Sequence, residues 1–390
     1  MSAVEASTMT SVDVEKSSTL GEELRSLVRL GLPIVASMAA SQVLGFVDVA
    51  MVGRLDAVAL AAVGIGNGIF FTISIMAMGL VLGMDPLVSQ AIGADEKGRA
   101  RAVLWQAVWI ALLSSVPAIV LMLLASMFVG RIGIDSATSQ SVFGFILGRF
   151  FSVVPFLVFT AARTYLQAVG GAGAVVRAYV WTNVVNFVGN VLFIYGDPGL
   201  EKFGLPGIGL PPLGVFGSGL SSTIASFVTV GIIYRALVRH GGRPIRDDFR
   251  RDMEVMRRIV RVGWPISMHL LAEVGAFSLA GVFAGWLGPQ ALAGHQVALS
   301  LASMSFVFAL GVGNATAVRV GMAVGRNDSV GARRAGFAGL LAGALMMSVS
   351  ILLFAFAPGF CARILSDKPD VIESAGAAAF MRFQNSMAPL

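Results

Sequence analysis

Long apolar stretches recur along almost the whole chain, and this feature restricts the fold more than any other. A helix needs about 20 consecutive apolar residues to cross a hydrocarbon core of roughly 30 Å, and the stretches have about that length. Strands of a membrane β-barrel would instead alternate in polarity over about ten residues, and the sequence does not alternate in this way. We therefore predict an all-α polytopic membrane protein with ten spans, at residues 30–52, 58–84, 101–129, 140–168, 175–195, 214–238, 260–286, 291–317, 334–358 and 371–388.

Composition and charge support a membrane protein with a cytoplasmic N-terminus. Only 13% of the residues are charged, about half the fraction found in soluble domains. With the N-terminus inside, 21 of the 28 basic residues fall on the cytoplasmic side, as the positive-inside rule requires. We expect a multi-pass protein of the cell inner (plasma) membrane.

The remaining composition excludes several other classes. Residues 1–24 are polar and acidic, so we expect a disordered cytoplasmic tail and not a signal peptide. The basic segment near 239–257 is expected to lie against anionic lipid headgroups and not to bind nucleic acid. Cys361 is the only cysteine, so neither a disulfide framework nor a cysteine metal cluster is expected. The sequence has no Walker A or paired aspartate-rich motif, and we expect neither an enzyme nor a cofactor.

An internal repeat divides the chain. A shift of 232 residues places LVRLGLPI (27–34) on IVRVGWPI (259–266) and AIGADEKGRARA (91–102) on AVGRNDSVGARR (323–334). Both copies begin on the cytoplasmic side, because an even number of crossings separates them. Parallel repeats of this kind are typical of secondary transporters, in which the substrate passes between two halves.

The repeat predicts two lobes of unequal length. We expect a first lobe of six spans at 25–238, a basic linker at 239–257, and a second lobe at 258–390. Six spans are expected in each lobe, but only about four fall in the second. We therefore expect the second lobe to be incomplete.

Two acidic residues lie inside predicted spans. Asp48 stands in the apolar stretch QVLGFVDVAMV, and Glu273 stands in HLLAEVGAF. Carboxylates within a bilayer are costly, and they commonly mark ion or proton paths. We expect both acids to face one central space and to couple transport, by holding a proton, a sodium ion or a cationic drug. The alternative for Asp48 is a position near the helix end, where it reaches interfacial water.

Four further residues are candidates for the cavity. Asn186 and Asn190 are four residues apart and share a helix face, which suits either cation coordination or hydrogen bonding between helices. His269 lies one turn before Glu273. We expect it to act either as a proton relay or as a hydrogen-bonding partner of a neighbour within its lobe. Gln42 is the remaining candidate. No metal site is expected.

The segments QVLGFVDVAMVGR, LAAVGIGNG, PLVSQAIGA, GWLGPQALAGHQVAL and RVGMAVGRND resemble the multidrug and toxic compound extrusion (MATE) family, in its NorM-like branch. The resemblance implies a twelve-helix, two-lobe antiporter, a monomer that exports cationic amphipathic drugs or toxic organic compounds in exchange for inward H⁺ or Na⁺. It also implies that Asp48, Asn186, Asn190 and Glu273 occupy the positions of the family's cavity residues. His295 and Gln296 match a pair that we expect to be structural.

The C-terminus departs from the family pattern. Phe383-Gln384 is followed by six residues, where NorM-like proteins continue with a further acid and two more helices. The alternatives are therefore a truncated membrane protein that does not transport, or a relative that moves lipid-linked saccharides.

Overall fold

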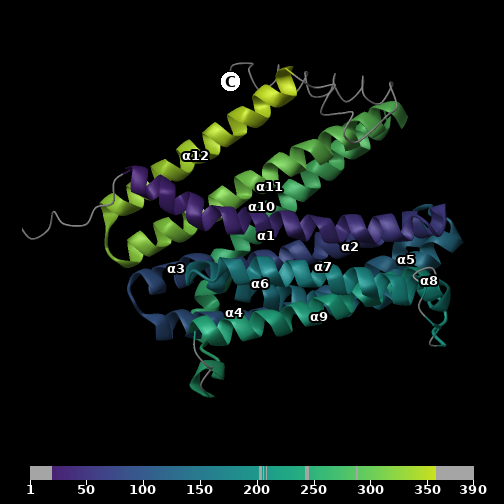
Figure 1. The fold of residues 1–390 in the computed structure, drawn as a ribbon, viewed down its shortest axis with the longest axis horizontal. Coiled ribbons are helices and arrows are strands. Elements are labelled where there is room, and N and C mark those ends of the chain that lie inside the picture. Colours follow the sequence, from purple (N-terminus) through teal and green to yellow (C-terminus); the bar gives the residue numbers. More distant parts are fainter. Residues whose placement is uncertain are drawn as a thin grey trace, which may run out of the picture.

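The computed structural model describes residues 20–356, apart from 202–203, 205, 208, 242–245 and 287–288. Within these residues the regular structure is entirely helical (Figure 1). The α-helices are α1 (Leu20–Val52), α2 (Ala57–Leu82), α3 (Asp85–Gly93), α4 (Lys97–Phe128), α5 (Ser136–Arg149), α6 (Val153–Ala168), α7 (Ala172–Tyr195), α8 (Asp197–Glu201), α9 (Gly214–Gly241), α10 (Met253–Trp286), α11 (Pro289–Gly325) and α12 (Ser329–Phe356). Short 3₁₀ turns lie at Val129–Ile132, Phe150–Ser152 and Arg246–Phe249 (η3).

Eight segments of the described chain are long and apolar enough to cross a membrane: Leu24–Val52, Ala57–Gly93, Lys97–Arg131, Ser136–Ala168, Ala172–Tyr195, Gly214–His240, Ser305–Gly325 and Ser329–Leu352. Each overlaps one of the ten predicted spans, although Ser305–Gly325 begins 14 residues after the start of the predicted span 291–317. The predicted span 260–286 corresponds to α10, whose apolar stretch is interrupted by His269 and Glu273. The predicted span 371–388 lies outside the described residues.

Side chains on the outer faces of the helices fit a lipid environment. Large apolar side chains are more than half exposed on several different helices, for example Phe71, Val116, Met127 and Val180. In water such a surface would favour aggregation. In a bilayer it is the face that the helices present to lipid, and their backbone polar groups are satisfied within each helix.

Helices α1 to α9 pack into one bundle, and α10 to α12 lie along one side of it (Figure 1). Within the bundle α7 packs between α1 and α9, α5 packs against α2 and α9, and α4 packs against α2 and α6. Helix α10 packs against α2, and α11 packs against α1, α3 and α12. Helices α1 and α2 therefore carry most of the contact between the two groups.

The contacts between these two groups follow the 232-residue repeat. A Cβ built on Gly93 would lie 2.1 Å from the carbonyl oxygen of Met322, and one built on Gly325 would lie 2.0 Å from that of Gln90. A shift of 232 residues converts the first pair into the second. The repeat therefore extends from the sequence to the packing, as it would for two copies related by a pseudo-two-fold axis.

The loops after α3 and α11 also repeat each other. Asp95 and Asn327, which the same shift superimposes, both have a φ of 58°. The next residue closes each loop with the same backbone hydrogen bond. The N–H of Glu96 donates to the carbonyl oxygen of Ala91 at 2.8 Å, and the N–H of Asp328 donates to that of Ala323 at 2.9 Å. Aspartate and asparagine are the residues other than glycine that tolerate this left-handed conformation best.

The segment before α10 is fastened to α4 by several contacts. Arg101 pairs with Asp248 at 2.8 Å, and the ring of Trp105 packs against that of Phe249 at an angle of 48°, with ring centroids 4.4 Å apart. The buried Gln106 donates to the carbonyl of Arg250 at 2.8 Å and accepts from the backbone N–H of Asp252 at 3.0 Å. The described part of the predicted linker is therefore docked on the bundle.

Candidate functional site

Asp48 lies in the last two turns of α1 and is 1% exposed. Its two carboxylate oxygens have different partners. Asn190 Nδ2 donates to Oδ1 at 2.7 Å, and Ser222 Oγ donates to Oδ2 at 2.9 Å. Arg149 Nη1 lies 3.6 Å from Oδ2. The carboxylate is thus held by side chains from α5, α7 and α9 in the interior of the bundle.

The two asparagines of α7 are part of the same network. Asn186 and Asn190 have no exposed surface, and Asn190 Nδ2 also donates to Asn186 Oδ1 at 3.2 Å. Asn186 Nδ2 donates to Ser222 Oγ at 3.2 Å. Asn190 Oδ1 is buried and has no hydrogen-bond partner among the described residues. A buried oxygen without a partner is uncommon, and it is an acceptor that a cation or a water molecule would satisfy.

Arg149, at the end of α5, is a member of this network that the sequence analysis did not identify. Its side chain is 14% exposed. Nη1 donates to Ser222 Oγ at 3.1 Å, and Cζ lies 4.4 Å from the centre of the Phe70 ring. The available signal was an arginine inside the predicted span 140–168. Such a residue needs a partner of opposite charge, and Asp48 is a buried acid in a neighbouring helix.

Small residues bring these helices close enough for short side chains to meet. A Cβ built on Gly189 of α7 would lie 2.5 Å from Ser221 Oγ on α9. One built on Gly148 of α5 would lie 2.4 Å from the carbonyl oxygen of Phe216, and one on Gly219 of α9 would lie 2.4 Å from that of Phe145. Close approach through small residues is the usual way in which membrane helices pack. It brings hydroxyl and amide groups of α7 and α9 within hydrogen-bond reach of Asp48.

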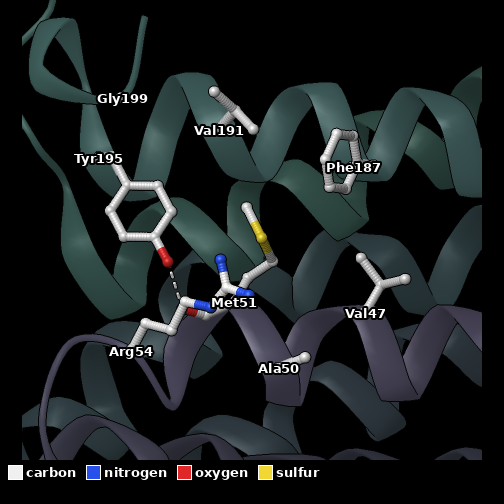
Figure 2. Close-up of a pocket in the computed structure, with 8 residues that line it drawn as sticks. All are labelled: Val47, Ala50, Met51, Arg54, Phe187, Val191, Tyr195 and Gly199. Carbon is white, nitrogen blue, oxygen red and sulfur yellow. Dashed lines mark hydrogen bonds between the residues drawn. The ribbon is translucent and has the colours of Figure 1, made fainter. Parts of the chain in front are cut away.

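A cavity of about 500 Å³ lies beside the network, between the ends of α1 and α7 (Figure 2). Tyr195 closes one end of it by donating from its hydroxyl to the carbonyl oxygen of Met51 at 2.5 Å. The wall is mostly apolar, with Arg54 as its charged member. Its lining residues are Val47, Ala50, Met51, Arg54, Phe187, Val191, Tyr195 and Gly199. Asp48 does not line this cavity.

The other predicted residues lie apart from the Asp48 network. Gln42 and His269 are exposed, and Glu273 is half-buried on α10. None of the described contacts of Asp48 comes from α10. His295 is buried and lies near Gly281, whereas the side chain of Gln296 lies outside the described part of the structure.

Asn183, which precedes Asn186 by one turn, connects helices. Its Nδ2 donates to the backbone carbonyl of Ala40 on α1 at 2.9 Å. This contact holds α7 against α1 two turns before Asp48. Within the described residues no group of three or more histidine, cysteine or acidic side chains is arranged to hold a metal ion.

Comparison with known proteins gives a consistent picture. The MatE family matches residues 33–192 and 265–384. The chain is 31% identical over 344 residues to a protein of Synechococcus called "Probable multidrug resistance protein NorM", covering 87% of this chain and 72% of the relative. It is 32% identical over 341 residues to a protein of the same name from Bradyrhizobium diazoefficiens, covering 86% and 71%.

Solved structures agree on the fold. The crystal structure of the eukaryotic MATE transporter AtDTX14 matches with a TM-score of 0.78 at 18% identity, over 92% of this chain and 78% of the other. A transporter of the MOP superfamily from Pyrococcus furiosus matches with a TM-score of 0.76 at 22% identity, over 94% and 80%.

Proposed function

Because this chain belongs to the MatE family of membrane transporters, we propose that it exports cationic, amphipathic organic compounds in exchange for protons or sodium ions that move inward. The chain is a multi-pass membrane protein and a transporter, not an enzyme. Its similarity to proteins called probable multidrug resistance proteins supports drugs and toxic organic compounds as the substrates. We place its N-terminus in the cytoplasm, because this orientation puts most of the basic residues on the cytoplasmic side.

The observation that carries the coupling proposal is the buried carboxylate of Asp48 among amide and hydroxyl groups. A carboxylate at this depth is costly unless it is protonated, paired or coordinated. Oxygen atoms are the ligands that hard cations prefer, and here the carboxylate is joined by Ser222 Oγ and Asn190 Oδ1. The same carboxylate can instead take up a proton. Either event changes the charge in the bundle by one unit.

Glu273 is proposed as the second coupling acid, on α10. It is half-buried, so water and a cationic substrate reach it more readily than they reach Asp48. We propose that the segments 25–238 and 258–390 act as two lobes, that the chain works as a monomer, and that substrate passes between the lobes. The glycine contacts that follow the repeat support this division, because each joins α3 of the first group to α11 of the second.

Dye efflux from proteoliposomes tests the proposal. Ethidium is loaded into vesicles that contain the purified chain, and a sodium gradient and a proton gradient are imposed in separate experiments. We expect one gradient to drive transport and Asp48→Asn and Glu273→Gln to reduce it at least tenfold. Asp56→Asn is the matched control, because Asp56 is an exposed N-cap of α2 and asparagine caps helices equally well.

Two results would contradict the proposal. If the folded protein does not transport the dye under either gradient, the proposal of coupled export is wrong. If Asp48→Asn transports the dye as fast as the control variant, Asp48 does not take part in coupling.

A further inference from the structure

We propose that Arg149 is a tethered competitor of the imported cation at Asp48: its guanidinium holds the carboxylate until a proton or sodium ion takes its place. This inference rests on the proposed coupling role of Asp48. It assigns to Arg149 a part in cation selection, as a residue that touches the binding carboxylate.

The argument begins with the balance of charge. Arg149 is the charged side chain that contacts Asp48 among the described residues, and the other partners are the neutral Asn190 and Ser222. One carboxylate balances one positive charge. Arginine keeps its charge in proteins, so it cannot make room for a cation by losing a proton. Binding of a cation at Asp48 and pairing with Arg149 must therefore weaken each other.

The hydrogen bonds of Ser222 add a second reason for competition. Its hydroxyl donates to Asp48 Oδ2 and accepts from Arg149 Nη1 at 3.1 Å and from Asn186 Nδ2 at 3.2 Å. The one proton and both lone pairs of the hydroxyl are then in use. An arriving sodium ion needs one of those lone pairs, and the guanidinium is the partner with the most freedom to leave.

The guanidinium of Arg149 has other favourable contacts when it leaves Asp48. Its Cζ lies 4.4 Å from the centre of the Phe70 ring and 5.6 Å from that of the Phe145 ring. Aromatic faces attract a guanidinium, most strongly where water is excluded. The displaced group would therefore keep part of its stabilisation, and the difference between the two positions would be small enough for exchange.

The helix packing restricts this exchange to side-chain movement. The backbones of α5 and α9 touch at Gly148 and Gly219, and Thr223 Oγ1 donates to the carbonyl oxygen of Gly148 at 2.7 Å. These contacts fix the distance between the Cα of Arg149 and Ser222. The guanidinium must therefore move by rotation of its own side chain. Because it is tethered beside Asp48, its effective concentration there is fixed and does not depend on the protein concentration.

The test measures cation binding without transport. The melting temperature of the purified full chain is recorded against sodium concentration at fixed pH and, in a second series without sodium, against pH. Binding to the folded state raises its stability by an amount that grows with the logarithm of one plus the ratio of cation concentration to dissociation constant. A fit of the rise to this relation gives the concentration, or pH, at which the site in the folded state is half occupied, and we call this value the midpoint. For Arg149→Gln we expect the midpoint to move to about tenfold lower sodium concentration, or about one pH unit higher. Arg149→Lys keeps the charge, and we expect its midpoint to stay within about threefold of the wild type.

Two further variants control the interpretation. Arg101→Gln removes the arginine of another ion pair, with Asp248, and should leave the midpoint unchanged. Asp48→Asn should abolish the rise with sodium and diminish the rise with falling pH, to which other carboxylates also contribute. An Arg149→Gln midpoint that is unchanged or shifted towards weaker binding would overturn the proposal, and so would the absence of any cation-dependent rise in both wild type and variant. If Arg149→Gln does not fold, Arg149→Lys decides by itself, because a midpoint more than tenfold from wild type contradicts a role that depends on charge.

Dye efflux distinguishes this proposal from the proposed function. Wild-type export that is driven by a cation gradient, together with an unchanged midpoint in Arg149→Gln, would retain coupled export and reject the competitor. Loss of wild-type export would reject the proposed function, whatever the midpoint of the variant.

Discussion

Replacement of Gly93 by alanine should destabilise the protein through a clash between two backbones. Gly93 ends α3, and the added Cβ would lie 2.1 Å from the carbonyl oxygen, 2.6 Å from the Cα and 2.7 Å from the carbonyl carbon of Met322. All three are backbone atoms of α11, so no side chain can rotate away. Helix α3 and helix α11 must separate by roughly 1 Å to restore normal contact distances, which forfeits much of the dispersion energy between them.

The size of the effect follows from two opposing contributions. Overpacking of this kind typically costs 1–3 kcal/mol. Replacing glycine by alanine in a helix contributes about 0.5–1 kcal/mol in the other direction. We therefore expect a net loss of about 1–2 kcal/mol in the free energy of unfolding, or a fall of roughly 1–3 °C in melting temperature for a chain of this length.

The assay is thermal unfolding of the purified chain in detergent, with Gly98→Ala as the control. Gly98 lies in α4, and a Cβ built there meets nothing within 4 Å, so this variant should be as stable as the wild type or slightly more so. By the internal repeat, Gly325→Ala should cost about as much as Gly93→Ala. The double variant should cost less than the sum, because one separation of α3 from α11 relieves both clashes. Gly93→Ala with the stability of Gly98→Ala would refute the reasoning.

Three further predictions concern other parts of the molecule. Asn190→Ala removes a hydrogen bond to the buried Asp48 and should lower the free energy of unfolding by about 1.5–3 kcal/mol, measured by thermal unfolding; a loss below about 0.5 kcal/mol contradicts it. Gln106→Leu removes both hydrogen bonds to the docked segment, at about 1 kcal/mol each, so trypsin should cleave near Arg250 about 30-fold faster; an unchanged cleavage rate would show that the other contacts are sufficient. The hydrogen bond from the backbone N–H of Thr138 lowers the pKa of Asp135 below its ordinary value of 3.8, so this cap stabilises the fold above that value and is lost as pH falls through the lowered pKa. Asp135→Asn should therefore flatten the melting profile below about pH 4, and a profile identical to the wild type contradicts the assignment.

Much of the fold could be predicted from the sequence because apolar length is a local property. The predicted span 140–168 shows the limit of this approach. It consists of α5 and α6 joined at Phe150–Ser152, and the single charged residue before the turn, Arg149, does not divide the apolar stretch into two. Hydropathy also cannot predict that α10 packs on α2 and α11 on α1. The internal repeat relates α1 to α10 and α2 to α11, so it predicts that one of these contacts accompanies the other.

The candidate site was predictable where its residues lie on one face of a single helix. Asn186 and Asn190 are four residues apart and do meet on one face of α7. Gln42 precedes Asp48 by six residues, which places it about 120° away around the helix, and its side chain is exposed. The pairing of Asp48 with Arg149 and Ser222 joins residues of α1, α5 and α9, and no sequence spacing indicates contacts between distant helices.

The contact between α3 and α11 also bears on how a chain like this came to exist. The repeat superimposes Ser89 on Gly321, and these two residues touch each other, since a Cβ built on Gly321 would lie 2.5 Å from Ser89 Cβ. In a symmetric dimer of half-length chains this position would meet its own copy across the axis, as in any isologous interface. Two serines would collide there, and two glycines would leave a gap. Two halves that are allowed to differ, as they are within one chain, can place a serine on one side and a glycine on the other, and the contact is then filled without a clash.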